Sequence, residues 1–340
     1  MKVKLETALC LLSLVLSTKT PADTVYVDQR FGPGGNGTKA APYDKIQTAI
    51  NDANSVTIIV YPGTYSESLN VTKTLTLLSY DGPHTTKIEA AAGGDTVTVQ
   101  PGIDVWIQGF NISTGRYGVL CQTSGSLHLR NNIFCGNSSH GVYVARTTLT
   151  TLPRVWIHNC LFVANGGSGI YLLHVDGWHY YDHYTYPSVE VYNSILIANT
   201  RYGIESSTTG YDSGPVTLDH NDSINNALGA YSAAFGSGNP ISIGAHSISV
   251  GPDFVGGSAN ACNQDFRLLP TSLCKDAGHA GIGFLDPDGT RNDIGAFGGP
   301  GAATFYTNPN DGPIIRSVTI DQGMVPRGST FTIRAKGATR

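Results

Sequence analysis

Apolar and polar residues alternate in five stretches of the chain. The stretches begin at Val105, Leu127, Val155, Val189 and Val216. In the second of them, Leu127 and Leu129 are apolar, and the residues on either side of Leu129 are polar. A period of two is strand spacing, so the apolar side chains are expected to face one interior. Two further short strands follow in each stretch, beginning at Ile133 and Val142 in this one.

The five stretches align so that turn residues share columns. The fifth column holds Gly109, Asn131, Asn159, Asn193 and His220, the eleventh Asn137, Asn165, Asn199 and Asn226, and the fifteenth Gly141, Gly169 and Gly203. A period of about twenty-two residues that returns the same turn residues is typical of a solenoid. Three strands per turn predict an all-β fold, a single-stranded parallel β-helix. The alternatives are five unrelated asparagine-rich turns, or leucine-rich repeats, which would need a helical stripe between the strands.

The fifth-column asparagines have an expected structural role. A short amide at a bend can bond the backbone of its own turn and the same residue one coil away, about 4.8 Å distant. Asn131, Asn159 and Asn193 are therefore predicted to hold the coils in register.

Insertions break the period. The five stretches start 22, 28, 34 and 27 residues apart, and the extra residues lie at Ala145 to Pro153, Leu173 to Ser188 and Ser206 to Gly214. All three fall between the third strand of one coil and the first strand of the next. Insertions into a solenoid gather on one face, often the binding face, so the functional surface is expected there.

Composition and the N-terminus predict an extracellular protein. Gly makes up 41 of 340 residues and charged residues only 14%, which suits an all-β secreted chain, and the net charge of −4 gives no reason to expect a nucleic-acid partner. Residues 1–23 resemble a signal peptide, with two lysines before an apolar run from Ala8 to Leu16 that is too short to span a bilayer. A buried strand is the alternative. We expect secretion or display at the cell surface, no membrane span, and a monomer.

The six cysteines leave room for a disulfide. Cys262 and Cys274 lie close in sequence around a turn and are the best candidates for a pair. Cys121, Cys135 and Cys160 fall in different columns and are expected to be small core residues.

Two segments outside the repeats carry motifs. The first, from Thr24, runs in the order VYVD, a glycine-rich loop, PY-x-x-IQ-x-AI-x-x-A, VYPGTY-x-E-x-L and K-x-L-T-L, and the second comprises DFRLLPTSLCKDAG and DPDGTRNDIGAFGGP. With the repeats, they resemble the secreted right-handed parallel β-helix proteins of the pectin lyase-like superfamily over residues 24–300. The resemblance implies a right-handed β-helix and a polysaccharide partner, since members mostly bind or cleave polysaccharides. The helical spacing within Tyr43–Ala53 predicts a helix that covers the open end of the solenoid.

Neither enzyme pattern of that superfamily transfers cleanly. A lyase needs a base, commonly Lys or Arg, and a cation or Ca²⁺ beside the uronate carboxylate, yet no Lys occurs between Lys87 and Lys275. The aspartate cluster of calcium-dependent pectate lyases is not apparent, and the NTD and G-x-DD strings of the hydrolases are absent. We predict no cofactor, with Ca²⁺ left open. A lyase or hydrolase and a non-catalytic glycan-binding module both stay open.

Outward positions near the insertions supply the candidate site. Aromatic faces with interspersed His, Arg and carboxylates suit sugar rings, which stack through C–H faces and bond through hydroxyls. The substrate-binding candidates are Trp106, Arg130, Tyr143, Trp156, His158, Tyr171 and Trp178, and the catalytic candidates are Arg146, His174, Asp176, Glu190 and Glu205. Strand-favouring residues packing along a sheet are the alternative explanation.

Two short segments invite a metal interpretation. The longest insertion contains His174, Asp176, His179, Asp182 and His183, but nothing in the sequence fixes their directions. The string DPDGTRND at residues 286–293 opens like a Ca²⁺ loop but lacks the distant Glu. We expect a structural turn there, in which Arg291 pairs with an aspartate, and predict no metal site.

The tail forms a separate unit in this interpretation. After a linker at residues 301–313, two alternating runs, Ile315 to Ile320 and Thr330 to Ala335, resemble the first strands of an immunoglobulin-like domain over residues 314–340. That fold needs roughly 100 residues. The chain is therefore expected to be a fragment of a longer modular protein, the alternative being a tail that docks on the helix end.

Overall fold

The computed structural model describes most of the chain from Asp23 onward. The described residues are 23–91, 93–145, 153–173, 188–207, 216–232, 241–257, 259, 261–302, and the strands at 314–320 and 333–338. The predicted signal peptide lies outside them, apart from Asp23.

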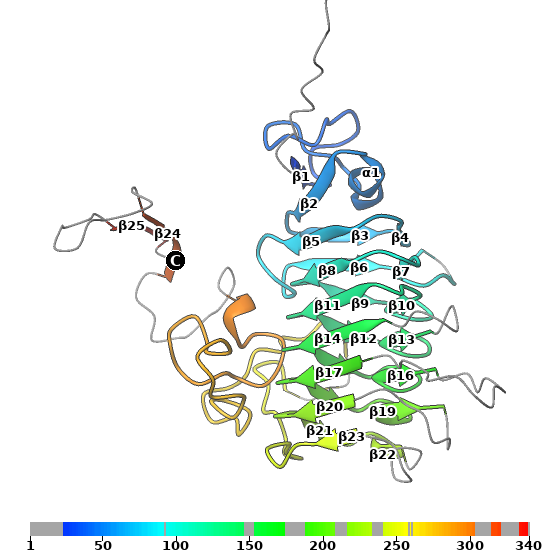
Figure 1. Cartoon of the computed structure of the whole chain (residues 1–340), viewed down its shortest axis with the longest axis vertical. Coiled ribbons are helices and arrows are strands. Elements are labelled where there is room, and N and C mark those ends of the chain that lie inside the picture. The colour runs from blue at the N-terminus through cyan, green and yellow to red at the C-terminus, as the bar shows by residue number, and fades with distance from the viewer. Residues whose placement is uncertain are drawn as a thin grey trace, which may run out of the picture.

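Three parallel sheets run the length of the solenoid (Figure 1). The first sheet contains β1 (Asp23–Val27), β2 (Ser55–Val60), β5 (Leu75–Ser79), β8 (Val105–Gln108), β11 (Ser126–Arg130), β14 (Arg154–His158), β17 (Ser188–Tyr192), β20 (Val216–Asp219) and β23 (Ile241–Ile243). The second contains β3 (Gly63–Ser66), β6 (Thr86–Glu89), β9 (Asn111–Ser113), β12 (Ile133–Cys135), β15 (Leu161–Val163), β18 (Ile195–Ile197) and β21 (Asp222–Ile224). The third contains β4 (Leu69–Val71), β7 (Val97–Val99), β10 (Val119–Cys121), β13 (Val142–Val144), β16 (Ile170–Leu172), β19 (Tyr202–Ser206) and β22 (Gly229–Tyr231).

Each complete coil adds one strand to the first, second and third sheet in turn, which confirms the predicted parallel β-helix. The register follows the sequence columns, since Leu127 pairs with Val105 on one side and Val155 on the other. Coils also extend beyond the five aligned stretches in both directions. The predicted N-terminal cap is present as α1 (Ile46–Asn51), which buries Ile46, Ala49 and Ile50 against the first coils.

The interior is a continuous apolar core. Inward residues from all three sheets are buried, and in the second sheet they include Phe134 and Phe162, whose rings stack with centroids 4.7 Å apart. Stacking along the axis repeats the same contact from coil to coil, as expected when one column carries similar side chains.

A long segment after β23 covers the outside of the second sheet. We call residues 244–302 the closing segment; it includes the short 3₁₀ helix η2 (Pro300–Ala302). Its Phe254, Phe266 and Ile294 form a second apolar cluster with outward residues of the second sheet such as Ile133 and Ile195. Strands β12, β15 and β18 are consequently buried at every position, and Figure 1 shows the segment in yellow and orange beside the coils.

The predicted disulfide is wrong in one partner. Cys262 pairs with Cys135 of β12, with Cα atoms 5.6 Å apart, and Cys274 is a buried thiol whose Sγ lies 3.2 Å from an Asp222 carboxylate oxygen. Cys135 is an outward residue of the second sheet, so it meets the closing segment rather than the interior. Nearness in sequence favoured Cys274, whereas the return of the chain along the sheet brings Cys262 to Cys135.

The two asparagine columns have different roles. The ladder from coil to coil is the eleventh column, where each side-chain amide donates to the next, from Asn137 to Asn165 (3.0 Å), on to Asn199 (2.8 Å) and on to Asn226 (2.8 Å). All four residues are buried. These bonds satisfy the amides in the interior, where an unpaired polar group would be costly.

The fifth-column asparagines instead bond the closing segment. Asn131 donates to the carbonyls of Ala296 and Gly298, Asn159 donates to Asn292 and neighbouring carbonyls, and Asn193 accepts from the His279 amide. Their expected amide contact from one coil to the next is replaced by these bonds. All three asparagines have φ of 50° to 52°, a left-handed conformation that Asn tolerates better than most residues. The column therefore shapes the bend and anchors the closing segment.

The tail contains an antiparallel pair, β24 (Ile314–Ile320) and β25 (Ile333–Ala338). These strands match the two alternating runs, the second displaced by three residues toward the C-terminus. An immunoglobulin-like domain stays a prediction. In the described part of the chain, no helix is long and apolar enough to cross a membrane.

Candidate functional site

Eight of the twelve candidate site residues lie in the described part of the chain. Arg146, His174, Asp176 and Trp178 fall on two of the insertions and lie outside the described residues. The others lie on strands of the first and third sheets, in the positions that the columns predict.

Trp106, His128 and Trp156 form a stack on β8, β11 and β14. Their ring centroids are 4.6 Å and 4.4 Å apart, and the planes are within 12° of parallel. Carbon atoms in contact lie about 3.5–4.0 Å apart. The centroids of these nearly parallel rings are further apart than that, so each ring is shifted sideways relative to the next. Each half-buried ring thus exposes an edge and only part of a face. We call these three residues the Trp–His stack.

Charged groups border the Trp–His stack. The Arg130 guanidinium carbon lies 5.1 Å from the centre of the Trp106 ring, and Glu190 follows Trp156 in register on the next strand. Burial, and then the charge of Arg130, lower the pKa of His128, so the histidine in the stack is neutral at pH 7. Within the described residues, no carboxylate lies within ion-pair distance of Arg130. The stack is therefore a neutral aromatic strip with a cation beside one end and a carboxylate beside the other.

A second aromatic strip lies on the third sheet and on the turns that precede its strands. The rings of Tyr117, Tyr143 and Tyr171 follow one another with centroids 4.5 Å and 5.2 Å apart, and His140 stacks on Tyr171 at 4.5 Å. The Arg116 guanidinium lies over Tyr117 at 4.5 Å and also bonds Asp95. Tyrosine supplies a hydroxyl as well as a ring, so this strip offers donors and acceptors at coil spacing.

The insertions connect the two sheets that carry these strips. Each connects a strand of the third sheet to the next strand of the first sheet: β13 to β14, β16 to β17, and β19 to β20. Tyr143 and Tyr171 lie in the strands just before the first two insertions, and Trp156 lies two residues into the strand after the first. Residues of both strips therefore lie close in sequence to the ends of the insertions.

The Glu205 carboxylate takes part in a buried network of structural hydrogen bonds. Its carboxylate, 6% exposed, accepts from the Arg201 guanidinium through both oxygens and from the Ser168 hydroxyl. Burial alone would raise its pKa, but the hydrogen bonds from Arg201 and Ser168 outweigh burial and lower it. With both oxygens engaged, Glu205 fits a structural ion pair better than a general acid.

The closing segment covers His158. Phe284 lies 6.0 Å from the His158 ring, and burial, followed by the charges of Arg130 and His128, lowers the pKa of His158 to about 4. Gly301 also approaches this column: its carbonyl accepts from Gln108 at 2.8 Å. Sequence reasoning placed His158 on an open surface because the path of the closing segment cannot be read from the columns.

The Ca²⁺-like string forms a structural turn. Asp286 is buried and accepts from the backbone amides of Gly299 and Asp293, and burial raises its pKa to about 8. Arg291 donates to the carbonyls of Gly278 and Ala277 rather than to an aspartate. The expected turn is present, but the expected ion pair of Arg291 is replaced by bonds to the backbone.

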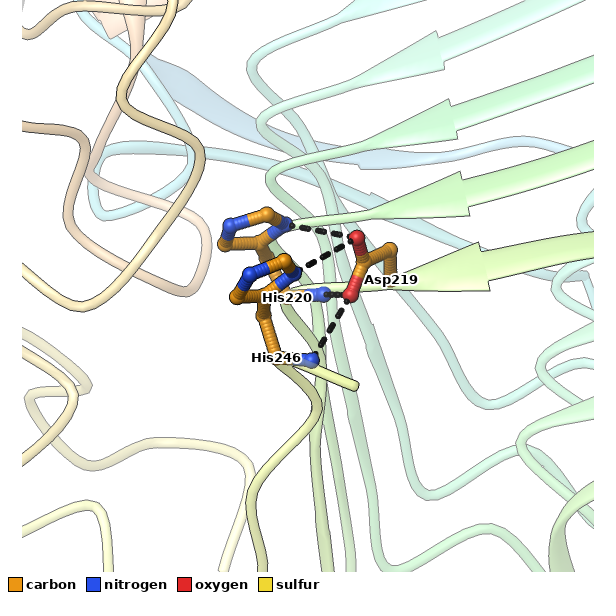
Figure 2. A group of neighbouring side chains, drawn as sticks. All are labelled: Asp219, His220 and His246. Atoms are coloured by element: carbon orange, nitrogen blue, oxygen red, sulfur yellow. Dashed lines mark hydrogen bonds and ion pairs between the residues drawn. The ribbon is translucent and has the colours of Figure 1, made fainter. Parts of the chain in front are cut away.

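Sequence reasoning missed a cluster at the end of the first sheet. Asp219 ends β20, His220 follows it in the fifth column, and His246 reaches the same carboxylate from the turn after β23 (Figure 2). His220 was visible as the exception in an asparagine column. His246 lies 26 residues further on, close to one period, after a strand (β23) that follows the five aligned stretches.

No protein-family model matches the chain. A cell surface glycoprotein of Methanothermus fervidus is 31% identical over 129 residues, which are 37% of this chain and 20% of that protein, so the chain spans about a fifth of that relative's length. A solved structure of pectate lyase Pel9A aligns over 81% of this chain and 96% of its own, at 15% identity and a TM-score of 0.35. The class that the fold defines is a parallel β-helix protein.

Proposed function

We propose that this protein is an extracellular glycan-binding member of the pectin lyase-like superfamily, and that it holds a uronate-containing polysaccharide along the Trp–His stack. The observation that carries the proposal is the stack itself with Arg130 beside it. A cation without an ion-pair partner among the described residues, next to an aromatic strip, suits a sugar carboxylate and the apolar face of its ring.

Coil spacing supports a polymer as the ligand. Successive rings are 4.4 Å to 4.6 Å apart, so three coils present one continuous strip rather than a closed pocket. The tyrosine strip offers further hydroxyls near the third sheet. The opening and closing motifs support the superfamily, and the relative described as a cell surface glycoprotein supports an extracellular location.

The test compares binding of polygalacturonate, alginate and neutral glucans by affinity electrophoresis. Trp156→Ala is expected to weaken binding of all bound polymers about tenfold, which corresponds to 1.4 kcal/mol. Arg130→Gln is expected to weaken only the uronate polymers. Tyr80→Ala and Arg30→Gln, at exposed positions in the N-terminal coils, are the matched controls. Equal retardation of Trp156→Ala and wild type would place the glycan elsewhere.

Cleavage is tested separately, by incubating the protein with the same polymers. Unsaturated products would be read by ultraviolet absorbance and new reducing ends by a colorimetric assay. If product forms, Glu190→Gln tests the carboxylate next to Trp156. Binding with neither product favours the non-catalytic module.

A further inference from the structure

We propose that Asp219, His220 and His246 form a binding site for a divalent transition-metal ion of the Zn²⁺ type. The three residues converge where β20 ends and where the turn after β23 passes over it (Figure 2). The site is independent of the glycan-binding proposal, because it uses none of the residues of the Trp–His stack.

The spacing of the ligand atoms fits a metal. Asp219 Oδ2 lies 3.3 Å from His220 Nδ1 and 3.1 Å from His246 Nδ1, and all three ligand atoms lie within 4.8 Å of one another. Zn²⁺ bonds of about 2.1 Å in a tetrahedral site place neighbouring ligand atoms about 3.4 Å apart. An ion can therefore fit among these atoms once the exposed His246 ring turns its Nδ1 lone pair toward it.

Hydrogen bonds from backbone amides orient the Asp219 carboxylate. Asp219 Oδ1 accepts from the amide of His220 at 2.9 Å and from the amide of His246 at 3.1 Å, which leaves Oδ2 turned toward the two imidazoles. Outer contacts of this kind orient metal ligands and raise affinity. Gly244 allows the approach, because a Cβ there would lie 2.1 Å from the Asp219 carboxyl carbon.

The buried side chain of His220 also supports a role as a metal ligand. The His220 side chain is 7% exposed, and its Nδ1 has no hydrogen-bond partner although it faces the carboxylate. Both Nδ1 atoms lie near the same oxygen, but the His220 and His246 rings are stacked, 4.5 Å apart and 11° from parallel, so one ring must turn before both lone pairs can reach one ion. The exposed His246 ring has room to do so. The contact that the buried His220 Nδ1 makes is its 3.3 Å approach to Asp219 Oδ2, and a metal ion bound by both atoms would satisfy it.

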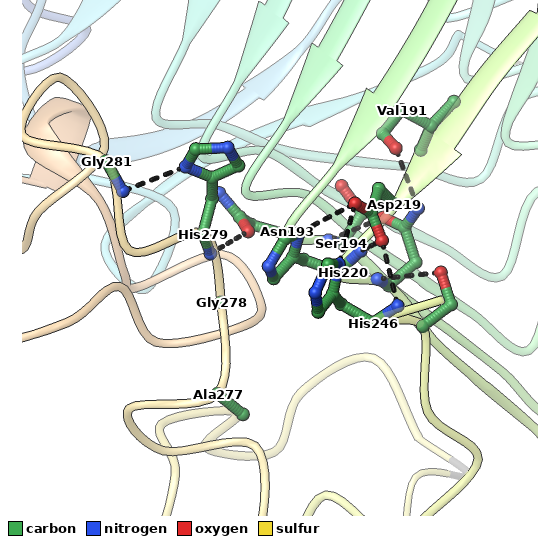
Figure 3. A network of polar contacts seen from close by, with 12 residues as sticks. Val191, Asn193, Ser194, Asp219, His220, His246, Ala277, Gly278, His279 and Gly281 are labelled. Atoms are coloured by element: carbon green, nitrogen blue, oxygen red, sulfur yellow. Dashed lines mark hydrogen bonds and ion pairs between the residues drawn. The ribbon is translucent and has the colours of Figure 1, made fainter. Parts of the chain in front are cut away.

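The surroundings complete a site with three protein ligands. His279 lies beside His220 but is not among the residues whose ligand atoms lie within 4.8 Å of one another. Its Nδ1 accepts from the Gly281 amide, and its own amide donates to Asn193 (Figure 3). The His246 side chain is 62% exposed, so an ion can enter from solvent and keep a water as its fourth ligand. Two nitrogens and one oxygen favour Zn²⁺ over Ca²⁺, which takes six to eight oxygen ligands.

The experiment is isothermal titration of the untagged protein with ZnCl₂ and, separately, CaCl₂, after treatment with chelator. Because other histidines of the chain can bind Zn²⁺, the decisive quantity is the stoichiometry lost on substitution. His246→Ala and Asp219→Asn should each lose one Zn²⁺ per protein or bind it at least about tenfold more weakly. His84→Ala, which removes an exposed histidine elsewhere, should bind as wild type does.

Folding and coordination are checked separately. His246→Ala should keep the wild-type circular dichroism and the wild-type melting temperature in chelator, since the side chain is exposed. Co²⁺ should give the visible absorption of a tetrahedral site in the wild type and in His84→Ala, but not in His246→Ala. Unchanged stoichiometry and affinity in a folded His246→Ala would overturn the proposal, as would a wild type that binds no Zn²⁺.

Discussion

The side chains of Asn159 and Asn292, 133 residues apart, bond each other in both directions. Asn159 Nδ2 donates to Asn292 Oδ1 at 2.8 Å, and Asn292 Nδ2 donates to Asn159 Oδ1 at 3.3 Å. Both residues are buried, so neither amide can turn to water. The pair links a bend of the β14 coil to the closing segment.

Asn159→Ala should therefore destabilise the protein by about 2–3 kcal/mol. The substitution leaves buried donors and acceptors of the closing segment without hydrogen-bond partners, and each such group costs about 1–3 kcal/mol. Urea unfolding followed by circular dichroism measures the change. Asn54→Ala, in an exposed turn, should stay within about 0.5 kcal/mol of wild type. Equal midpoints for the two variants would show that the closing segment adds little stability.

The eleventh-column ladder should be at least as sensitive. Asn165 accepts from the Asn137 side chain and donates to the Asn199 side chain and the Phe134 carbonyl. Asn165→Ala should cost about 2–4 kcal/mol, since bonds on both sides are lost. The same urea titration measures it, and a loss below that of Asn159→Ala would contradict the role assigned to the ladder.

The disulfide between Cys135 and Cys262 can be tested by peptide mapping. Digestion without reductant should yield a peptide joining Cys135 to Cys262, while Cys274 is alkylated only after unfolding because its thiol is buried. Cys262→Ser should lower the free energy of unfolding by about 2–4 kcal/mol, as removal of a bond closing a long loop does. A peptide joining Cys262 to Cys274 would refute this assignment.

His158 should make the protein sensitive to acid. Its pKa is about 4 in the folded protein and about 6.5 when unfolded. Between those values the unfolded chain takes up a proton that the folded chain does not, so stability falls as the pH drops from 6.5 toward 4. His158→Phe should remove up to about 3 kcal/mol of that loss, since a shift of one pKa unit is worth 1.36 kcal/mol. Parallel stability curves for the two proteins between pH 7 and 4 would argue against it.

The repeats made the coils predictable from the sequence. The contacts of the closing segment, which passes back along the second sheet, were hard to predict. Columns of turn residues and period-two alternation predicted the strands and their register, because both depend on contacts with the next coil. The capping helix was predicted from the helical spacing within Tyr43–Ala53. Cys135 and His158 were misjudged for one reason: their partners Cys262 and Phe284 lie more than a hundred residues away in a segment without periodicity. The aromatic columns were located correctly, but only the structure shows that their faces stack on one another.

The closing segment also changes how the solenoid comes apart. Coils that contact only their neighbours can fray one at a time from an end. Here one segment bonds Gln108, Asn131, Asn159, Asn193 and Asp222, residues of five successive coils. Opening any one of these coils strains the bonds made to the others, so this part of the array should unfold as a cooperative block rather than by unzipping.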